Sequence, residues 1–290
     1  MQDRRIHIVK RHFFELLHAQ WQQKRFLCVG LDPDLTKFPP SVNNGNLTEK
    51  VLVRFFCDIV DATAGHTATY KPNLAFFERH ALKGGISALW SIIRHIHKVA
   101  PDVPVICDAK RGDIGHTNEA SAELIFGELG CDAVTLNPYV GRDAMEPFLK
   151  HEEKGCIFIA KTSNPGSGKF QDIHVNTWTQ LWIVIARTIQ RDWNKNGNCG
   201  LVIGATYPAE LARARRDLED DAFILVPGLG TQGGDLEASV ASARNSDCTG
   251  GAVFNSSRGI IYASSGLDYA MAAGEAAAKM NRQLAAAMTA

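Results

Sequence analysis

Short apolar runs recur along the chain, and a segment long enough for a helix follows each of them. The first run covers residues 26–31 and leads, through a loop rich in Pro, Asn and Gly, to a helical pattern over residues 48–63. The runs are continuously apolar rather than alternating, which is typical of strands covered on both faces. Seven further runs are centred near Thr69, Val105, Val134, Phe158, Val202, Leu225 and Val253.

Polar residues, mainly Asp, Asn, Pro, Gly and Ser, follow the end of each run. Eight strand–helix units with polar strand ends predict an α/β fold, a (β/α)8 barrel of the TIM type with its site at the carboxyl-terminal ends of the strands. A doubly wound parallel sheet is the alternative architecture. Because no G-x-G-x-x-G opens the first helix, a dinucleotide-binding sheet is disfavoured.

Both ends of the chain carry helical patterns. Apolar spacing over residues 6–22 predicts an extra helix ahead of the barrel, and the Ala-rich residues 271–290 predict a closing helix. We therefore expect one domain over residues 1–290, with the leading helix in 1–25, the barrel core in 26–263 and the closing helix in 264–290. The Gly/Pro/Ser-rich residues 164–169 predict an inserted loop beside the site; a mobile lid and a fixed loop fit this composition equally well.

Charge and composition narrow the class of partner. Lys+Arg and Asp+Glu number 31 each, so no basic field attracts nucleic acid. The seven Cys form no C-x-x-C pair and several lie in apolar runs, which predicts reduced thiols in a cytoplasmic protein. No leader-like segment opens the sequence, and no apolar run approaches the roughly 18 residues of a membrane span. We expect a small molecule or another protein as partner, and no membrane.

One segment carries a high density of charge. Asp108, Lys110 and Asp113 follow directly on the apolar residues 103–107. If those residues form a strand, Asp108 and Lys110 project to the same side of its end. Taken alone, the segment fits a salt-bridged surface turn and a functional site about equally. In a barrel the seven other strand ends converge on it, which favours the site.

Glycines and an arginine follow the last two predicted strands. The loops after strands seven and eight are the usual phosphate site of a TIM barrel. Glycine N–H groups can approach an oxyanion closely, and Arg258 can add a bidentate contact. We predict phosphate binding, although the same glycines could serve only to form tight turns. They are Gly228, Gly230, Gly233 and Gly234.

Together these strand ends resemble a known enzyme family, the orotidine 5′-phosphate decarboxylases. The resemblance covers all eight strand ends, over residues 26–263, and is greatest to the longer, mainly bacterial (type 2) branch. It is carried by Leu31-Asp32, Lys71-Pro72-Asn73, Asp108-x-Lys110-x-x-Asp113, Pro227-Gly228 with Gln232, and Arg258.

The resemblance implies decarboxylation of orotidine 5′-monophosphate (OMP) to UMP, the last step of de novo pyrimidine nucleotide synthesis, with no cofactor and no metal. Lys110 would stabilise a carbanion at C6 and then protonate it, within an alternating charge array formed with Lys71, Asp108 and Asp113. Asp113 and Thr117 would come from the partner subunit, so that a homodimer with shared active sites is implied.

The resemblance also implies a contact for each part of the nucleotide. Ser163 would meet the pyrimidine edge, and Asp32 with Thr117 would meet the ribose hydroxyls. The phosphate would be bound by Pro227, Gly228, Gln232 and Arg258.

Two alternatives to this function stay open. A catalytically silent barrel that binds phosphosugars or nucleotides would not need the charge array. A magnesium-dependent sugar-phosphate decarboxylase of the same superfamily shares D-x-K-x-x-D but holds its metal partly through a Glu on the second strand, where this chain has the cationic Lys71. For four other polar residues a structural role is at least as well supported as a functional one: His116, Asn137, Lys161 and Thr206.

Overall fold

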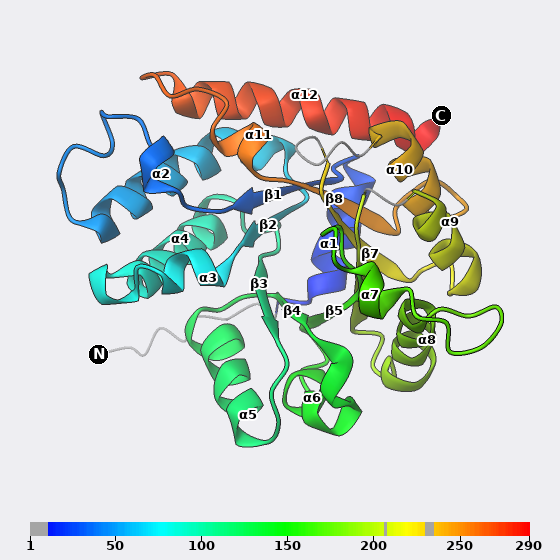
Figure 1. Cartoon of the computed structure of the whole chain (residues 1–290). Coiled ribbons are helices and arrows are strands. Elements are labelled where there is room, and N and C mark those ends of the chain that lie inside the picture. Colours follow the sequence, from blue (N-terminus) through cyan, green and yellow to red (C-terminus); the bar gives the residue numbers. More distant parts are fainter. Residues whose placement is uncertain (1–10, 206–207, 230–234) are drawn as a thin grey trace, which may run out of the picture.

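The computed structural model describes residues 11–205, 208–229 and 235–290, and at its centre lies a barrel of parallel strands (Figure 1). The strand order is β2-β1-β8-β7-β6-β5-β4-β3, so β1 pairs with β8 and consecutive strands are neighbours. In the described residues the strands are β1 (Leu27–Leu31), β2 (Thr69–Pro72), β3 (Ile106–Arg111), β4 (Ala133–Leu136), β5 (Gly155–Lys161), β6 (Cys199–Ile203), β7 (Phe223–Pro227) and β8 (Ala252–Ser256).

The barrel closes between β2 and β3 through two isolated bridges. Tyr70 pairs with Val105, and Asn73 pairs with Asp108, both in the parallel sense. A doubly wound sheet would reverse its strand order at one point, and no reversal occurs. The predicted TIM-type barrel is therefore confirmed, and the alternative architecture is wrong.

The continuous apolar runs become strands because both of their faces are buried. All five residues of β1, β6 and β8 are buried. One face fills the inside of the barrel, and the other packs against the surrounding helices. The continuously apolar runs of the sequence thus form the barrel, and the polar residues lie at the ends of its strands.

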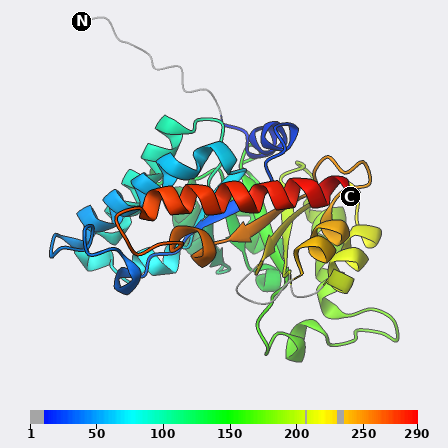
Figure 2. The same ribbon diagram turned by 90° about the horizontal axis from the view of Figure 1, so that it is seen from above.

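Helices surround the barrel (Figures 1 and 2). α2 begins at Thr48 and ends at Thr63, as predicted, and its apolar face buries Phe55, Phe56 and Ile59. The other helices of the ring are α4 (Gly85–Val99), α5 (His116–Ala122), α6 (Arg142–Leu149), α8 (Leu181–Thr188), α9 (Pro208–Asp217), α10 (Leu236–Ala243) and α12 (Tyr269–Thr289). Shorter helices are α3 (Leu74–Glu78), α7 (Gly168–Gln171) and α11 (Arg258–Ile261), and π-helical turns continue α5 over Glu123–Glu128 and α8 over Ile189–Trp193.

The leading helix, α1 (Phe13–Gln22), packs at the amino-terminal end of the barrel, where Phe13 and Phe223 have ring centroids 5.7 Å apart. The prediction of helix from residue 6 is wrong for residues 11–12, and residues 6–10 lie outside the described residues. The helix begins only at Phe13 because hydrogen bonds to other parts of the chain hold the residues at its start. Arg11 Nε donates to Asp132 Oδ1 at 2.8 Å, and Phe13 N donates to Glu153 O at 2.9 Å.

The predicted closing helix is α12, which runs along one side of the barrel and is the long red helix of Figure 2. It lies between α2 and α10 and so completes the helical ring. Asn281 fixes it to the first strand, since its Oδ1 accepts a hydrogen bond from Phe26 N at 2.9 Å.

The seven cysteines are free thiols, and five of them are buried, as the sequence predicted. Within the described part of the chain, none of the helices has both the length and the apolar character needed to span a bilayer.

Candidate active site

The site begins where β3 continues past its apolar residues. Asp108 and Lys110 both lie in this strand, and its pairing with β4 shifts register between Cys107 and Arg111. Lys110 has φ +48°, a left-handed conformation that is uncommon for a residue other than glycine and that often marks a functional position. Thr135 of β4 holds this conformation, because its hydroxyl accepts a hydrogen bond from Lys110 N at 3.0 Å.

Three of the predicted catalytic side chains meet at this strand end. Asp108 accepts a 2.9 Å hydrogen bond from Lys71 Nζ at Oδ2 and a 2.5 Å hydrogen bond from Lys110 Nζ at Oδ1. The Thr135 hydroxyl also donates to Asp108 Oδ1, at 2.9 Å. Lys71 and Asp108 are buried, whereas the Lys110 side chain is 46% exposed. Lys110 is therefore the member of this array that faces the opening of the barrel.

The array keeps its two buried groups, Asp108 and Lys71, ionised. Burial by itself raises the pKa of Asp108, but the ammonium groups of Lys71 and Lys110 outweigh it and hold this pKa well below its usual range. Burial lowers the pKa of Lys71, but the nearby carboxylates of Asp108 and Asp32 outweigh it and raise this pKa. The buried cation of Lys71 and the buried anion of Asp108 thus persist across neutral pH.

Asp113 and Thr117 do not join the array within this chain. Both are exposed, and no ion pair connects Asp113 to Lys71 or Lys110 among the residues the structure describes. The Asp113 carboxylate instead accepts a hydrogen bond from Ile114 N at 2.7 Å. The fourth member of the predicted array is therefore exposed and unpaired with the other three within the described part of its own chain.

A cavity of about 160 Å³ lies beside the array and gathers five of the predicted substrate-binding residues. Oδ1 of Asp32 is buried and has no hydrogen-bond partner among the described residues. An unpaired carboxylate oxygen in a cavity is suited to accept a hydrogen bond from a ligand hydroxyl. Gln232 lies outside the described residues. The five are Asp32, Ser163, Pro227, Gly228 and Arg258.

The sequence assigned no specific role to several polar residues of this region. Thr135 was detectable as the polar residue within an apolar run, but its contacts depend on how β3 and β4 pair. Asn73 lies 3.5 Å from Asp108 Oδ2 through its side-chain nitrogen. Asn255 and Ser257 line the cavity, and Gly30 leaves room for Ser257, whose Oγ would lie 1.9 Å from a Cβ at position 30.

Of the four polar residues for which the sequence supported a structural role at least as well as a functional one, three lie in the described part of the chain. Asn137 caps a short helical turn by accepting from Tyr139 N at 3.2 Å, and His116 is the exposed first residue of α5. Lys161 is buried and ion-paired with Asp172. Thr206 lies outside the described residues.

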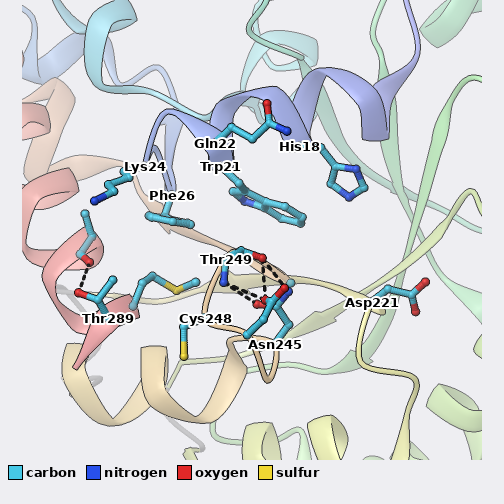
Figure 3. Close-up of a pocket in the computed structure, with 14 residues that line it drawn as sticks. His18, Trp21, Gln22, Lys24, Phe26, Asp221, Asn245, Cys248, Thr249 and Thr289 are labelled. Carbon is cyan, nitrogen blue, oxygen red and sulfur yellow. Dashed lines mark hydrogen bonds between the residues drawn. The ribbon is translucent and has the colours of Figure 1, made fainter.

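A larger cavity, of about 660 Å³, lies at the opposite, amino-terminal end of the barrel (Figure 3). Trp21 and Phe26 line it together with the loop that precedes β8. The polar groups of that loop bond mainly to one another, as Asn245 does with Thr249 N at 3.0 Å. Among the residues that line this cavity no cation is paired with a carboxylate, unlike at the carboxyl-terminal end of the barrel.

Known proteins are similar to this chain over nearly its whole length. The sequence is 46% identical over 267 residues to an orotidine 5′-phosphate decarboxylase of Azoarcus sp. (strain BH72), covering 92% of this chain and 96% of that protein. It is 45% identical over 280 residues to one of Roseiflexus castenholzii, covering 96% and 99%. The solved structure of Leishmania donovani OMP decarboxylase superposes with a TM-score of 0.80 at 35% identity, covering 96% of this chain and 99% of that one.

A sequence model of the orotidine 5′-phosphate decarboxylase / HUMPS family matches residues 25–272. This match spans the whole barrel and every residue of the charge array. The chain belongs to the orotidine 5′-phosphate decarboxylase / HUMPS family.

Proposed function

We propose that this protein decarboxylates OMP to UMP, with Lys110 beside C6 of the pyrimidine. The observation that carries the proposal is the contiguous array of Lys71, Asp108 and Lys110 at the barrel mouth, in a chain of this family. Loss of CO2 leaves an electron pair on C6. The Lys110 ammonium stabilises that charge and then transfers its proton to C6, and solvent reprotonates the amine.

A single ion pair cannot account for the catalysis. At about 4 Å and an effective dielectric constant of about 20, it contributes about 4 kcal/mol, whereas enzymatic accelerations correspond to roughly 8–23 kcal/mol. Preorganised surroundings and binding energy at the remote phosphate supply the rest. Thr135 and Lys71 belong to those surroundings, since both hold Asp108 in place.

Each part of the nucleotide has a proposed contact. Ser163 binds the pyrimidine edge, and Asp32 accepts a hydrogen bond from a ribose hydroxyl. The lining of one cavity by these residues and by Arg258 supports this assignment. The phosphate is bound by Pro227, Gly228, Gln232 and Arg258.

We further propose a homodimer in which Asp113 and Thr117 complete the partner's site. Their exposure, and the absence of an ion pair to the array among the described residues, support this assignment. Apolar side chains are exposed nearby, on the loops after β3 and β4: Ile114 is 64% and Tyr139 is 89% exposed. A second copy would bury them.

The alternative of a magnesium-dependent sugar-phosphate decarboxylase is disfavoured by Lys71. Its ammonium occupies the strand position where those enzymes place a metal-binding Glu, and it already neutralises Asp108 at 2.9 Å. A divalent cation there would face like charge.

One assay separates the three candidate functions. Purified protein is mixed with OMP in EDTA, and the orotate absorbance is followed. We expect the absorbance to fall. Turnover only after addition of Mg2+ would favour the metal-dependent relative, and binding of OMP without turnover would favour the silent barrel.

A further inference from the structure

Lys161, the last residue of β5, is a buried lysine outside the catalytic array. Its side chain is 0% exposed, and its ammonium pairs with Asp172 Oδ1. Lysines are seldom fully buried unless they are paired, because taking the charge out of water is costly. Asp172 directly follows α7, eleven residues further along the chain. The pair therefore ties the end of a barrel strand to the residue after α7, just beyond the inserted loop of residues 164–169.

A second set of hydrogen bonds closes the base of the same segment. Gln171 Oε1 accepts from Thr162 N at 3.0 Å, and Gln171 Nε2 donates to Thr162 Oγ1 at 2.9 Å. The α7 turn packs closely on Asp172, since a Cβ at Gly168 would lie 2.7 Å from Asp172 Oδ2. Residues 162 and 171 are thus held side by side, with Lys161 and Asp172 directly behind them.

Ser163 lies between this base and the next strand. A Cβ at Gly204, just after β6, would lie 2.9 Å from Ser163 Cβ and 3.2 Å from its backbone N. Gly204 N also donates to Lys161 O at 3.0 Å. Ser163 is therefore fixed on one side by Gly204 and on the other by the base of the loop, while it lines the cavity that also contains Arg258.

We propose that Lys161 and Asp172 are positioning residues for the pyrimidine subsite. The ion pair holds the base of the loop, and the base holds the Ser163 hydroxyl at the ring edge; neither charged group touches the substrate. Because Lys161 is buried and the Asp172 side chain is 37% exposed, withdrawal of the loop would remove an anionic partner from a buried ammonium. This inference rests on the proposed function only for the identity of the ring that Ser163 meets.

The test compares UMP, which contains the pyrimidine ring, with ribose 5-phosphate, which lacks it. Asp172→Asn keeps the size of the side chain and removes its charge. We expect its affinity for UMP to fall about ten-fold, the loss of one hydrogen bond at the ring edge, with its affinity for ribose 5-phosphate unchanged. Asp172→Glu should restore part of the affinity for UMP. Calorimetry measures both ligands, and KM for OMP should rise more than kcat falls.

Gly204→Ala provides an independent variant, because the added methyl group displaces Ser163 directly. It should likewise lower the affinity for UMP and leave the affinity for ribose 5-phosphate unchanged. Lys169→Met, on the exposed face of α7, is the matched control and should bind both ligands as the wild type does. Equal losses for both ligands, or an unchanged affinity for UMP in Asp172→Asn, would overturn the proposal. Failure of the wild type to decarboxylate OMP would instead refute the proposed function, because the binding comparison does not depend on turnover.

Discussion

At the scale of single residues, Lys110 shows how local conformation and charge combine. Its backbone adopts φ +48° and is held by Thr135, while its ammonium is held by Asp108. The strain of a left-handed lysine persists only where its surroundings fix it. Here the neighbouring strand fixes it, and the side chain is consequently directed at the barrel opening.

Removal of the Lys110 ammonium should abolish turnover and spare binding. Lys110→Ala leaves Lys71 to neutralise Asp108, so the barrel should remain folded. We expect kcat to fall by about a thousand-fold or more, corresponding to the roughly 4 kcal/mol of one close charge interaction. Titration with UMP should still give measurable affinity. A variant that keeps near-normal kcat would disprove the role of Lys110.

Asp132 provides a residue-scale prediction about stability. Burial raises its pKa, but His97 and Arg11 outweigh it and lower this pKa to about 2. Because the folded pKa lies below the unfolded value of about 3.9, the stabilisation is present above pH 4 and is lost as the pH falls through about 2. Its size at neutral pH is roughly 2 kcal/mol.

Asp132→Asn should therefore lower the free energy of unfolding by roughly 2 kcal/mol at pH 7. The difference from the wild type should narrow by about half between pH 5 and pH 3. Urea denaturation at each pH measures this difference in the free energy of unfolding. Asp102→Asn, a substitution at an exposed residue, is the control. A difference that stays constant with pH would show that the charge of Asp132 contributes nothing.

At the scale of elements, close approach of neighbouring strand ends builds the phosphate side of the site. The end of β1 passes so near the loop after β8 that residue 30 must lack a side chain. Ser257, which precedes the proposed phosphate ligand Arg258, occupies the space where a Cβ would lie. The position of that loop is thus set by a glycine in another strand.

Gly30→Ala should displace Ser257 and weaken phosphate binding. We expect affinity for ribose 5-phosphate to fall about ten-fold, because Arg258 moves with its neighbour. Gly65→Ala is the matched control, since a Cβ there has open space. Unchanged affinity in Gly30→Ala would show that this close approach does not position the phosphate site.

At the scale of the whole molecule, three charges of the predicted array pair with one another at the barrel mouth, and the fourth, on Asp113, is exposed. Lys71, Asp108 and Lys110 belong to one chain's site, and Asp113 completes another's in the proposed dimer. Such sharing makes each subunit inactive without a partner.

Complementation between two inactive variants tests this arrangement. Lys110→Ala and Asp113→Ala should each be inactive alone. After mixing and subunit exchange, mixed dimers contain one site with both defects and one intact site, so about one quarter of wild-type activity should return. No recovery, with exchange verified by differently tagged chains, would place Asp113 in its own chain's site or outside the chemistry.

The sequence by itself determined those features that depend on local patterns. Continuous apolar runs located the eight strands, and apolar periodicity located the helix over Thr48–Thr63, because burial on both faces or on one face leaves a short-range signature. The two-residue spacing of Asp108 and Lys110 likewise predicted that their side chains project to the same side of the strand end. The division into a leading helix over 1–25, a core over 26–263 and a closing helix over 264–290 stays a prediction.

Only the tertiary structure decided which distant residues meet. Thr135 holds Lys110 because of the register between two strands, and Gly30 faces Ser257 because the barrel closes. Asp172, the partner of Lys161, lies just beyond the inserted loop of residues 164–169, and no local pattern specifies the path of that loop. The family resemblance implied the charge array, but the contacts that hold it in place depend on how the chain closes on itself.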